Sequence, residues 1–96
     1  MGNVWYLIMS CSLCTLKIKK YIYEENDKFI IIDCMSCLVP MIVWKEHTMT
    51  VSEEDAKLME RHLNFVGIAK FGIDKFEITK DQRAVLDHLH WHAHPK

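Results

Sequence analysis

The chain has 96 residues, of which 50% are hydrophobic and 26% charged, and its formal net charge is −1. This balance is typical of one small globular domain, expected over residues 1–96, and excludes a disordered chain. It predicts no basic surface, which argues against nucleic acid as a partner. The apolar run at residues 4–9 is shorter than the roughly 17–25 residues of a spanning helix, so no membrane span is expected.

All four cysteines lie in two Cys-x-x-Cys pairs, Cys11 with Cys14 and Cys34 with Cys37. Two thiolates at this spacing can share one tetrahedral zinc ion. No basic secretory region precedes the pairs, which favours metal ligation over structural disulfides. We therefore expect a cytoplasmic protein with zinc as its cofactor.

The segments around the second cysteine pair predict β-strands. Residues 16–23 and 28–33 form a predicted hairpin with a turn at residues 24–27. Residues 39–44 predict a third strand, with Pro40 at its beginning or at an edge because proline cannot donate to a strand ladder.

The next segment predicts the one clear helix. Ser52 can cap the first amide groups, and the three acidic residues after it suit the positive end of the helix dipole. Apolar residues recur at helical spacing at Ala56, Met59, Leu63 and Val66. Gly67 is the expected end of the helix. Residues 75–79 alternate and predict a further strand, so we expect an α+β fold, an antiparallel sheet with one main helix packed on it.

The chain ends with a histidine at every second position: His88, His90, His92 and His94. Apolar residues separate them, and this alternation predicts a strand over residues 84–94. In a strand, residues two apart point to one face, roughly 6.5–7 Å apart along it. The row therefore supplies imidazoles that could act as a nucleophile and as a proton donor near neutral pH.

Two sets of residues could complete a zinc site. The two cysteine pairs together have a spacing close to that of a zinc ribbon, and the hairpin between them would bring Cys14 and Cys34 together. Alternatively, Cys11 and Cys14 could combine with His47 and one of the terminal histidines. The sequence leaves both sites open.

The order of these features resembles the histidine triad (HIT) superfamily from Cys11 onward. The features are the first cysteine pair, the hairpin, Lys45-Glu46-His47, the helix and the final run His88-Leu89-His90-Trp91-His92-Ala93-His94-Pro95-Lys96. Members carry His-φ-His-φ-His-φ-φ, where φ is an apolar residue, commonly followed by proline and a basic residue. In this register His88, His90 and His92 correspond to the triad, and His94 takes a position that is usually aliphatic.

The resemblance implies a hydrolase or nucleotidyl transferase that acts on a small-molecule nucleotide and forms a homodimer, with this chain a short, divergent member of the superfamily. It implies that His90 attacks an α-phosphate to form a nucleotidyl-histidine, which water or another acceptor resolves. His92 would contact the phosphate or the leaving group, and Asp33 falls near the acidic residue that typically meets the ribose. His88 would support His90.

In zinc-bearing members of the superfamily, the resemblance implies that His88 binds the metal together with Cys11, Cys14 and His47. The rival set is the all-cysteine site of Cys11, Cys14, Cys34 and Cys37.

Two segments differ from the family pattern, both where substrate would bind. Residues 79–86 contain no glycine, whereas typical members hold phosphate there with an Asn and a Gly-Gln pair. Arg83 or Lys80 could supply charge instead. Residues 34–39 replace a loop that usually contains proline and glycine. A non-catalytic zinc-binding module therefore remains an alternative, while redox chemistry lacks the thioredoxin arrangement of a Cys-x-x-Cys pair that opens a helix after a strand.

Overall fold

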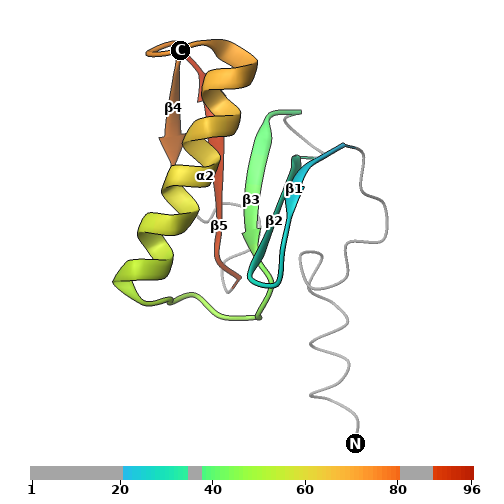
Figure 1. The fold of residues 1–96 in the computed structure, drawn as a ribbon, viewed down its shortest axis with the longest axis vertical. Helices are drawn as coiled ribbons and strands as arrows, with labels where there is room; N and C mark the ends of the chain where they lie inside the picture. Colours follow the sequence, from blue (N-terminus) through green and yellow to red (C-terminus); the bar gives the residue numbers. More distant parts are fainter. Residues whose placement is uncertain (1–20, 35–37, 81–87) are drawn as a thin grey trace, which may run out of the picture.

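The computed structural model describes residues 21–34, 38–80 and 88–96. The elements of this part of the chain are β1 (Ile22–Glu25), β2 (Phe29–Asp33), β3 (Pro40–Trp44), α2 (Glu53–Phe71), β4 (Phe76–Thr79) and β5 (His90–Pro95). The strands form one antiparallel sheet in the order β1-β2-β3-β5-β4, with α2 packed on one face (Figure 1). The predicted α+β fold is confirmed.

The hairpin of β1 and β2 turns at Asn26. The side-chain oxygen of Asn26 accepts hydrogen bonds from the backbone N–H groups of Lys28 and Phe29, at 2.8 and 2.9 Å, which is a common way for asparagine to stabilise a turn. The turn is therefore later than predicted, and Glu24 and Glu25 belong to β1. The predicted first strand also included residues 16–20, which lie outside the described residues.

β2 and β3 are neighbouring, strongly buried strands, and β3 is the central strand of the sheet. Residues 29–32 of β2 and all five residues of β3 are buried. Pro40 is the first residue of β3, as predicted, and is paired with Asp33. Residues on both faces of these strands are buried, so the strands show no alternation of polar and apolar residues.

The helix α2 begins where the sequence predicts and ends later. The Ser52 hydroxyl accepts a hydrogen bond from the backbone N–H of Asp55 at 3.1 Å and caps the helix. The prediction that the helix ends at Gly67 is wrong: α2 continues to Phe71 and stops at Gly72, whose φ is 104°. Gly67 is buried against β4, where an added Cβ would collide with the Phe76 ring.

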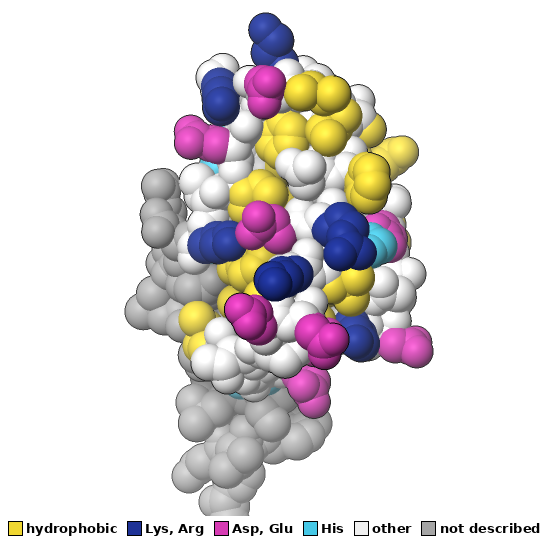
Figure 2. Space-filling view, turned by 60° about the vertical axis from the view of Figure 1, so that its left-hand side comes forward, with side chains coloured by type: hydrophobic (Ala, Val, Ile, Leu, Met, Phe, Trp, Pro, Cys, Tyr) yellow, Lys and Arg dark blue, Asp and Glu magenta, His cyan; other side chains and the backbone are white. Residues whose placement is uncertain are grey.

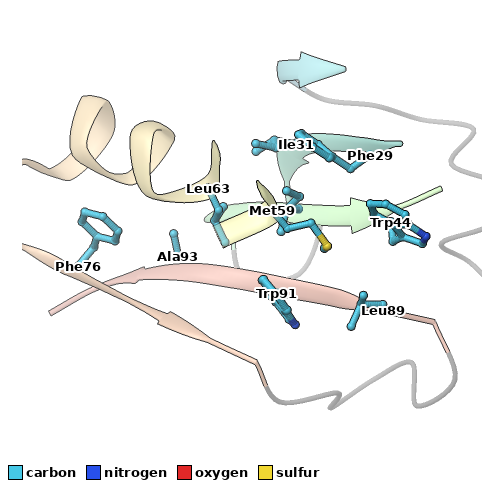
Figure 3. Close-up of a cluster of buried hydrophobic side chains, with 10 residues drawn as sticks. Phe29, Ile31, Trp44, Met59, Leu63, Phe76, Leu89, Trp91 and Ala93 are labelled. Atoms are coloured by element: carbon cyan, nitrogen blue, oxygen red, sulfur yellow. The ribbon is translucent and has the colours of Figure 1, made fainter. Parts of the chain in front are cut away.

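The main core lies between α2 and the sheet (Figure 3). Met59 and Leu63 of the helix are fully buried there, with side chains from β2, β3, β4 and β5. Trp91 and Ala93 belong to this cluster, so the alternate residues of β5, its histidines, face the other side of the sheet. No helix in the described ranges is long and apolar enough to cross a membrane.

On the face shown in Figure 2, charged side chains of both signs are mixed rather than gathered by sign. Three exposed lysines are paired with carboxylates on other elements: Lys28 with Asp55, Lys45 with Glu25 and Lys80 with Glu60. Exposed pairs of this kind typically contribute less than about 1 kcal/mol each. The fold is therefore held mainly by the buried apolar residues of the core.

Candidate histidine site

Three of the four alternating histidines form a row on the face of the sheet that α2 leaves uncovered. His90 is paired with Val43 of β3, and His92 with Met41. The ring centroids of His90 and His92 are 5.5 Å apart, and those of His92 and His94 are also 5.5 Å apart. The strand period therefore places these three imidazoles side by side, as predicted.

His90 is held in one orientation by the backbone. Its side chain is nearly buried, at 3% exposure, and its Nδ1 lies 2.8 Å from the carbonyl oxygen of His88. A carbonyl only accepts hydrogen bonds, so Nδ1 carries the proton in this contact. In the neutral ring Nε2 is then the basic nitrogen. The geometry suits a nucleophile that reacts through Nε2.

His88 leaves the row because the chain bends before β5. Leu89 pairs with the segment after β3, since its N–H donates to Thr48 O at 2.8 Å and its carbonyl accepts from Trp44 N–H at 3.2 Å. The fully buried ring of His88 donates from Nε2 to the Trp44 carbonyl at 2.6 Å. It packs edge-on to the His47 ring, with centroids 5.2 Å apart. The predicted row of four is therefore a row of three, with His88 beside His47.

Asp33 lies on the opposite side of the sheet from this row. The Tyr23 hydroxyl donates to Asp33 Oδ1 at 2.7 Å, and Lys70 Nζ donates to the Tyr23 oxygen at 2.9 Å and to Asp33 Oδ1 at 3.4 Å. Because Lys70 belongs to α2, Asp33 faces the helix. The structure therefore does not bring Asp33 beside His90, and its contact with a ribose stays a prediction.

Tyr23, Asp33 and Lys70 sit at one end of an open pocket of about 550 Å³ between β1 and α2. The other residues that line it are Tyr21, Phe65, Val66 and Ala69. Burial raises the pKa of Tyr23, and the Asp33 carboxylate acts in the same direction. The hydrogen bond to Tyr23 raises the pKa of Lys70. Both groups therefore keep their protons to higher pH than usual.

No family model and no curated protein matches the sequence. Solved structures do match. A hypothetical protein from Leishmania major has a TM-score of 0.72 and 19% identity, with 93% of this chain and 74% of that chain covered. A HIT family hydrolase from Clostridium thermocellum has a TM-score of 0.64 and 19% identity, with 92% of this chain and 89% of that chain covered. This chain has the HIT-like fold.

Within the HIT-like fold, the described residues that distinguish the two candidate zinc sites, Cys34 and the pair His47/His88, lie at opposite ends of β3. Cys34 precedes β3 and donates its backbone N–H to Val39 O, whereas His47 and His88 lie past the end of β3. The five residues of β3 span about 13–16 Å. Zinc lies about 2.0–2.3 Å from each ligand, so Cys34 and the pair His47/His88 cannot share one ion.

Two of the four proposed ligands of the mixed cysteine/histidine site, His47 and His88, are described, and their rings lie next to each other. With Nε2 of His88 bonded to a carbonyl, Nδ1 is the nitrogen that can bind metal, and such a hydrogen bond commonly orients a ligating histidine. Cys11, Cys14 and Cys37 lie outside the described residues. Within the described ranges, no group of three or more His, Cys, Asp or Glu side chains could hold a metal ion.

Lys80 and Arg83 were expected to supply the positive charge that could replace the missing glycines, and the structure describes only Lys80. Lys80 Nζ bonds Glu60 at 2.8 Å and lies 4.6 Å from the centre of the Trp91 ring, on the α2 side of the sheet. It is therefore directed away from the histidine row. Arg83 lies outside the described residues, and its role stays a prediction.

Two residues of the helix side, Tyr23 and Lys70, were not predicted to have any role. They are 47 positions apart in the sequence, and no local pattern connects them. The rings of Tyr21 and Phe65 line the same pocket and are 60% and 65% exposed, but this exposure is a property of the fold and gives no signal in the sequence.

Proposed function

We propose that this protein is a nucleotide hydrolase or nucleotidyl transferase that acts on an α-phosphate through a covalent nucleotidyl-histidine at His90. The observation that carries the proposal is the hydrogen bond from Nδ1 of His90 to the carbonyl oxygen of His88, which makes Nε2 the basic nitrogen. The HIT-like fold adds support, because one protein of similar structure is described as a HIT family hydrolase.

The first step forms a bond between Nε2 of His90 and the α-phosphorus, while the bond from phosphorus to the leaving group breaks. The electron pair of that bond leaves with the leaving group, which His92 protonates. The ring of His90 becomes positively charged in the intermediate. The His88 carbonyl stabilises this charge, because it keeps accepting the hydrogen bond of Nδ1.

In the second step, water or another acceptor attacks the phosphorus and breaks its bond to Nε2. The attacking group loses its proton to His92, which returns to its starting form, and His90 is regenerated as a neutral imidazole. Water as the acceptor gives hydrolysis, whereas an alcohol or phosphate gives nucleotidyl transfer. The same two histidines serve both reactions.

The proposed substrate is a small nucleotide, with Arg83 at its phosphates. Asp33 is the last residue of β2 and faces α2, so its proposed contact with the ribose requires the nucleoside to pass the end of that strand. We expect a homodimer, because β1 and β4 are the edge strands of the described sheet and small domains often cover such edges with a second copy. The paired cysteines fit a reducing compartment such as the cytoplasm.

Zinc is the proposed cofactor, held by Cys11, Cys14, His47 and His88. In this arrangement His88 would have two functions, since its ring would bind zinc while its backbone carbonyl orients His90. Bound zinc would supply structural stability and fix the position of that carbonyl. An all-cysteine site would leave His88 with only the second function.

The test is intact-mass analysis, without acid, after incubation with an adenosine phosphoramidate and with a diadenosine polyphosphate. We expect an adenylyl adduct or released AMP with the natural protein and neither with His90→Ala. His62→Ala is the matched control, because His62 lies on α2 and bonds Glu24 away from the row. Adduct formation that survives His90→Ala would contradict the assignment of the nucleophile.

The alternative function is a non-catalytic zinc-binding module. It is favoured by the absence of glycine from residues 79–86, where HIT proteins typically hold phosphate. Zinc bound at full stoichiometry, with no adduct and no turnover of either nucleotide, would favour this alternative over catalysis.

A further inference from the structure

The fourth histidine, His94, has no function in the reaction described above. It is half-buried on β5 and continues the row, with its ring centroid 5.5 Å from that of His92. Neighbouring residues Ala93 and Trp91 face the core on the other side of the sheet. His94 therefore belongs to the face that carries the proposed reaction.

The ring of His94 offers its nitrogens to a ligand. Among the described residues, its ring packs at a tilt against the His92 ring and forms no hydrogen bond. Partial burial of a polar ring without a protein partner is unfavourable, and a bound ligand could compensate for it. This distinguishes His94 from His90, whose Nδ1 is bonded to the backbone.

The strand beside His94 is polar on the same face. β4 pairs Glu77 with His94 and Thr79 with His92, and paired residues in a sheet direct their side chains to the same face. The Thr79 hydroxyl can donate a hydrogen bond toward the row. Glu77 is exposed, so water and salt screen its charge. Thr79 therefore suits an anionic ligand, whereas the Glu77 carboxylate opposes it only weakly because its charge is screened.

The order of the histidines along β5 indicates which kind of leaving group could reach His94. In the proposed reaction His90 attacks the α-phosphorus and His92 protonates the leaving group. His94 is the next residue of this face beyond His92, roughly 6.5–7 Å farther along β5. A leaving group that ends at its first atom cannot reach it, whereas one that continues as a chain of phosphates can.

We propose that His94 is a specificity-determining residue that binds the phosphate chain of the leaving group, so that the site favours nucleotides whose leaving group is an oligophosphate. This inference rests on the proposed function. An imidazole N–H donates to a phosphate oxygen, and such charge-assisted hydrogen bonds are stronger than neutral ones. An aliphatic side chain at this position would offer no such bond.

The kinetic test compares two substrates with the same adenylyl group and different leaving groups, an adenosine phosphoramidate and diadenosine tetraphosphate. His94→Leu should lower kcat/KM for the tetraphosphate about tenfold more than for the phosphoramidate, mainly through KM. His94→Gln, which keeps an N–H donor, should recover part of the difference. Equal losses for both substrates would mean a merely structural role and would overturn the inference.

A binding test separates this inference from the proposed function. The natural protein, labelled with ¹³C in its histidine rings, is titrated with tripolyphosphate alone. The Cε1–H signal that disappears in His94→Leu should move saturably, and that of His62 should not. A response without turnover of either substrate would sink the proposed catalysis and leave His94 as a phosphate-binding residue. Turnover of the substrates with no shift of the His94 signal would support the proposed catalysis and overturn the proposed role of His94.

Discussion

Nδ1 of His90 and the backbone carbonyl of His88, two positions earlier, lie 2.8 Å apart. This hydrogen bond sets the tautomer of the neutral His90 ring and helps to fix its orientation. A nucleophile oriented in this way has its reactive nitrogen Nε2 directed along a fixed line, so the group that protonates the leaving group must also have a fixed place. We propose that His92, with its ring centroid 5.5 Å away, is that group.

The role of His92 predicts a dependence on the leaving group. His92→Ala should lower kcat for an adenosine phosphoramidate by about 10²–10⁴-fold, the usual contribution of a positioned acid. The loss should be much smaller for a p-nitrophenyl ester of AMP, since p-nitrophenolate leaves without a proton. Steady-state kinetics with both substrates measure the ratio. Similar losses for both would show that His92 binds phosphate rather than donating a proton.

Replacing Gly67 with alanine should destabilise the protein, the opposite of the usual effect of this substitution within a helix. Glycine to alanine in a helix interior usually stabilises a protein by about 1 kcal/mol. Here the new methyl group would meet the Phe76 ring, so Gly67→Ala should destabilise the fold by about 1–3 kcal/mol in urea unfolding. The same substitution in a Phe76→Leu background has more room and should cost less than in the natural chain. A stabilised Gly67→Ala variant would contradict the packing.

Gly67 also shows which features the sequence could predict. The start of α2 follows from Ser52 and the acidic residues beside it, and the histidine row follows from the strand period, so both were predicted from neighbouring positions. The end of α2 was not, because Gly67 is required by a ring on β4 rather than by a turn.

Contacts distant in sequence explain the other differences. His88 leaves the row because Leu89 pairs with Trp44 and Thr48, and Asp33 turns toward α2 because Tyr23 and Lys70 bind its carboxylate. Neither set of partners is marked by a periodic pattern. The candidate nucleophile could therefore be predicted from local alternation, whereas the surroundings of the candidate zinc and ribose residues could not.

Tyr23 and Lys70 predict a loss of stability at alkaline pH. The pKa of both groups is higher in the folded state than in the unfolded state. At a pH between these two pKa values, the folded state therefore binds more protons than the unfolded state. Stability then falls as pH rises above about 10. Tyr23→Phe should make the urea midpoint less dependent on pH between about pH 9 and pH 11. Tyr21→Phe is the control, and an identical pH slope in the natural chain and Tyr23→Phe would refute the effect.

Asp33 permits a test of its proposed contact with a ribose. If the carboxylate binds the ribose hydroxyls, the natural protein should prefer a ribonucleotide over its 2′-deoxy analogue, and Asp33→Asn should reduce that preference about tenfold, mainly through KM. Tyr23→Phe is a matched control, because it removes the tyrosine hydroxyl that bonds Asp33 and keeps the carboxylate. A preference that is unchanged in Asp33→Asn would limit the residue to its contacts with Tyr23 and Lys70.

Because Cys34 lies at the other end of β3 from His47 and His88, single substitutions distinguish the two candidate zinc sites. If zinc is bound by Cys11, Cys14, His47 and His88, His47→Ala should lower the zinc content measured by atomic emission, and Cys34→Ser should not. The all-cysteine site predicts the opposite result, because Cys34 lies at the other end of β3 from the histidine pair. Full zinc content in both variants would exclude both sites. In the mixed site, a chelator should also slow formation of the His90 adduct, since losing the metal from His88 loosens the carbonyl that orients His90.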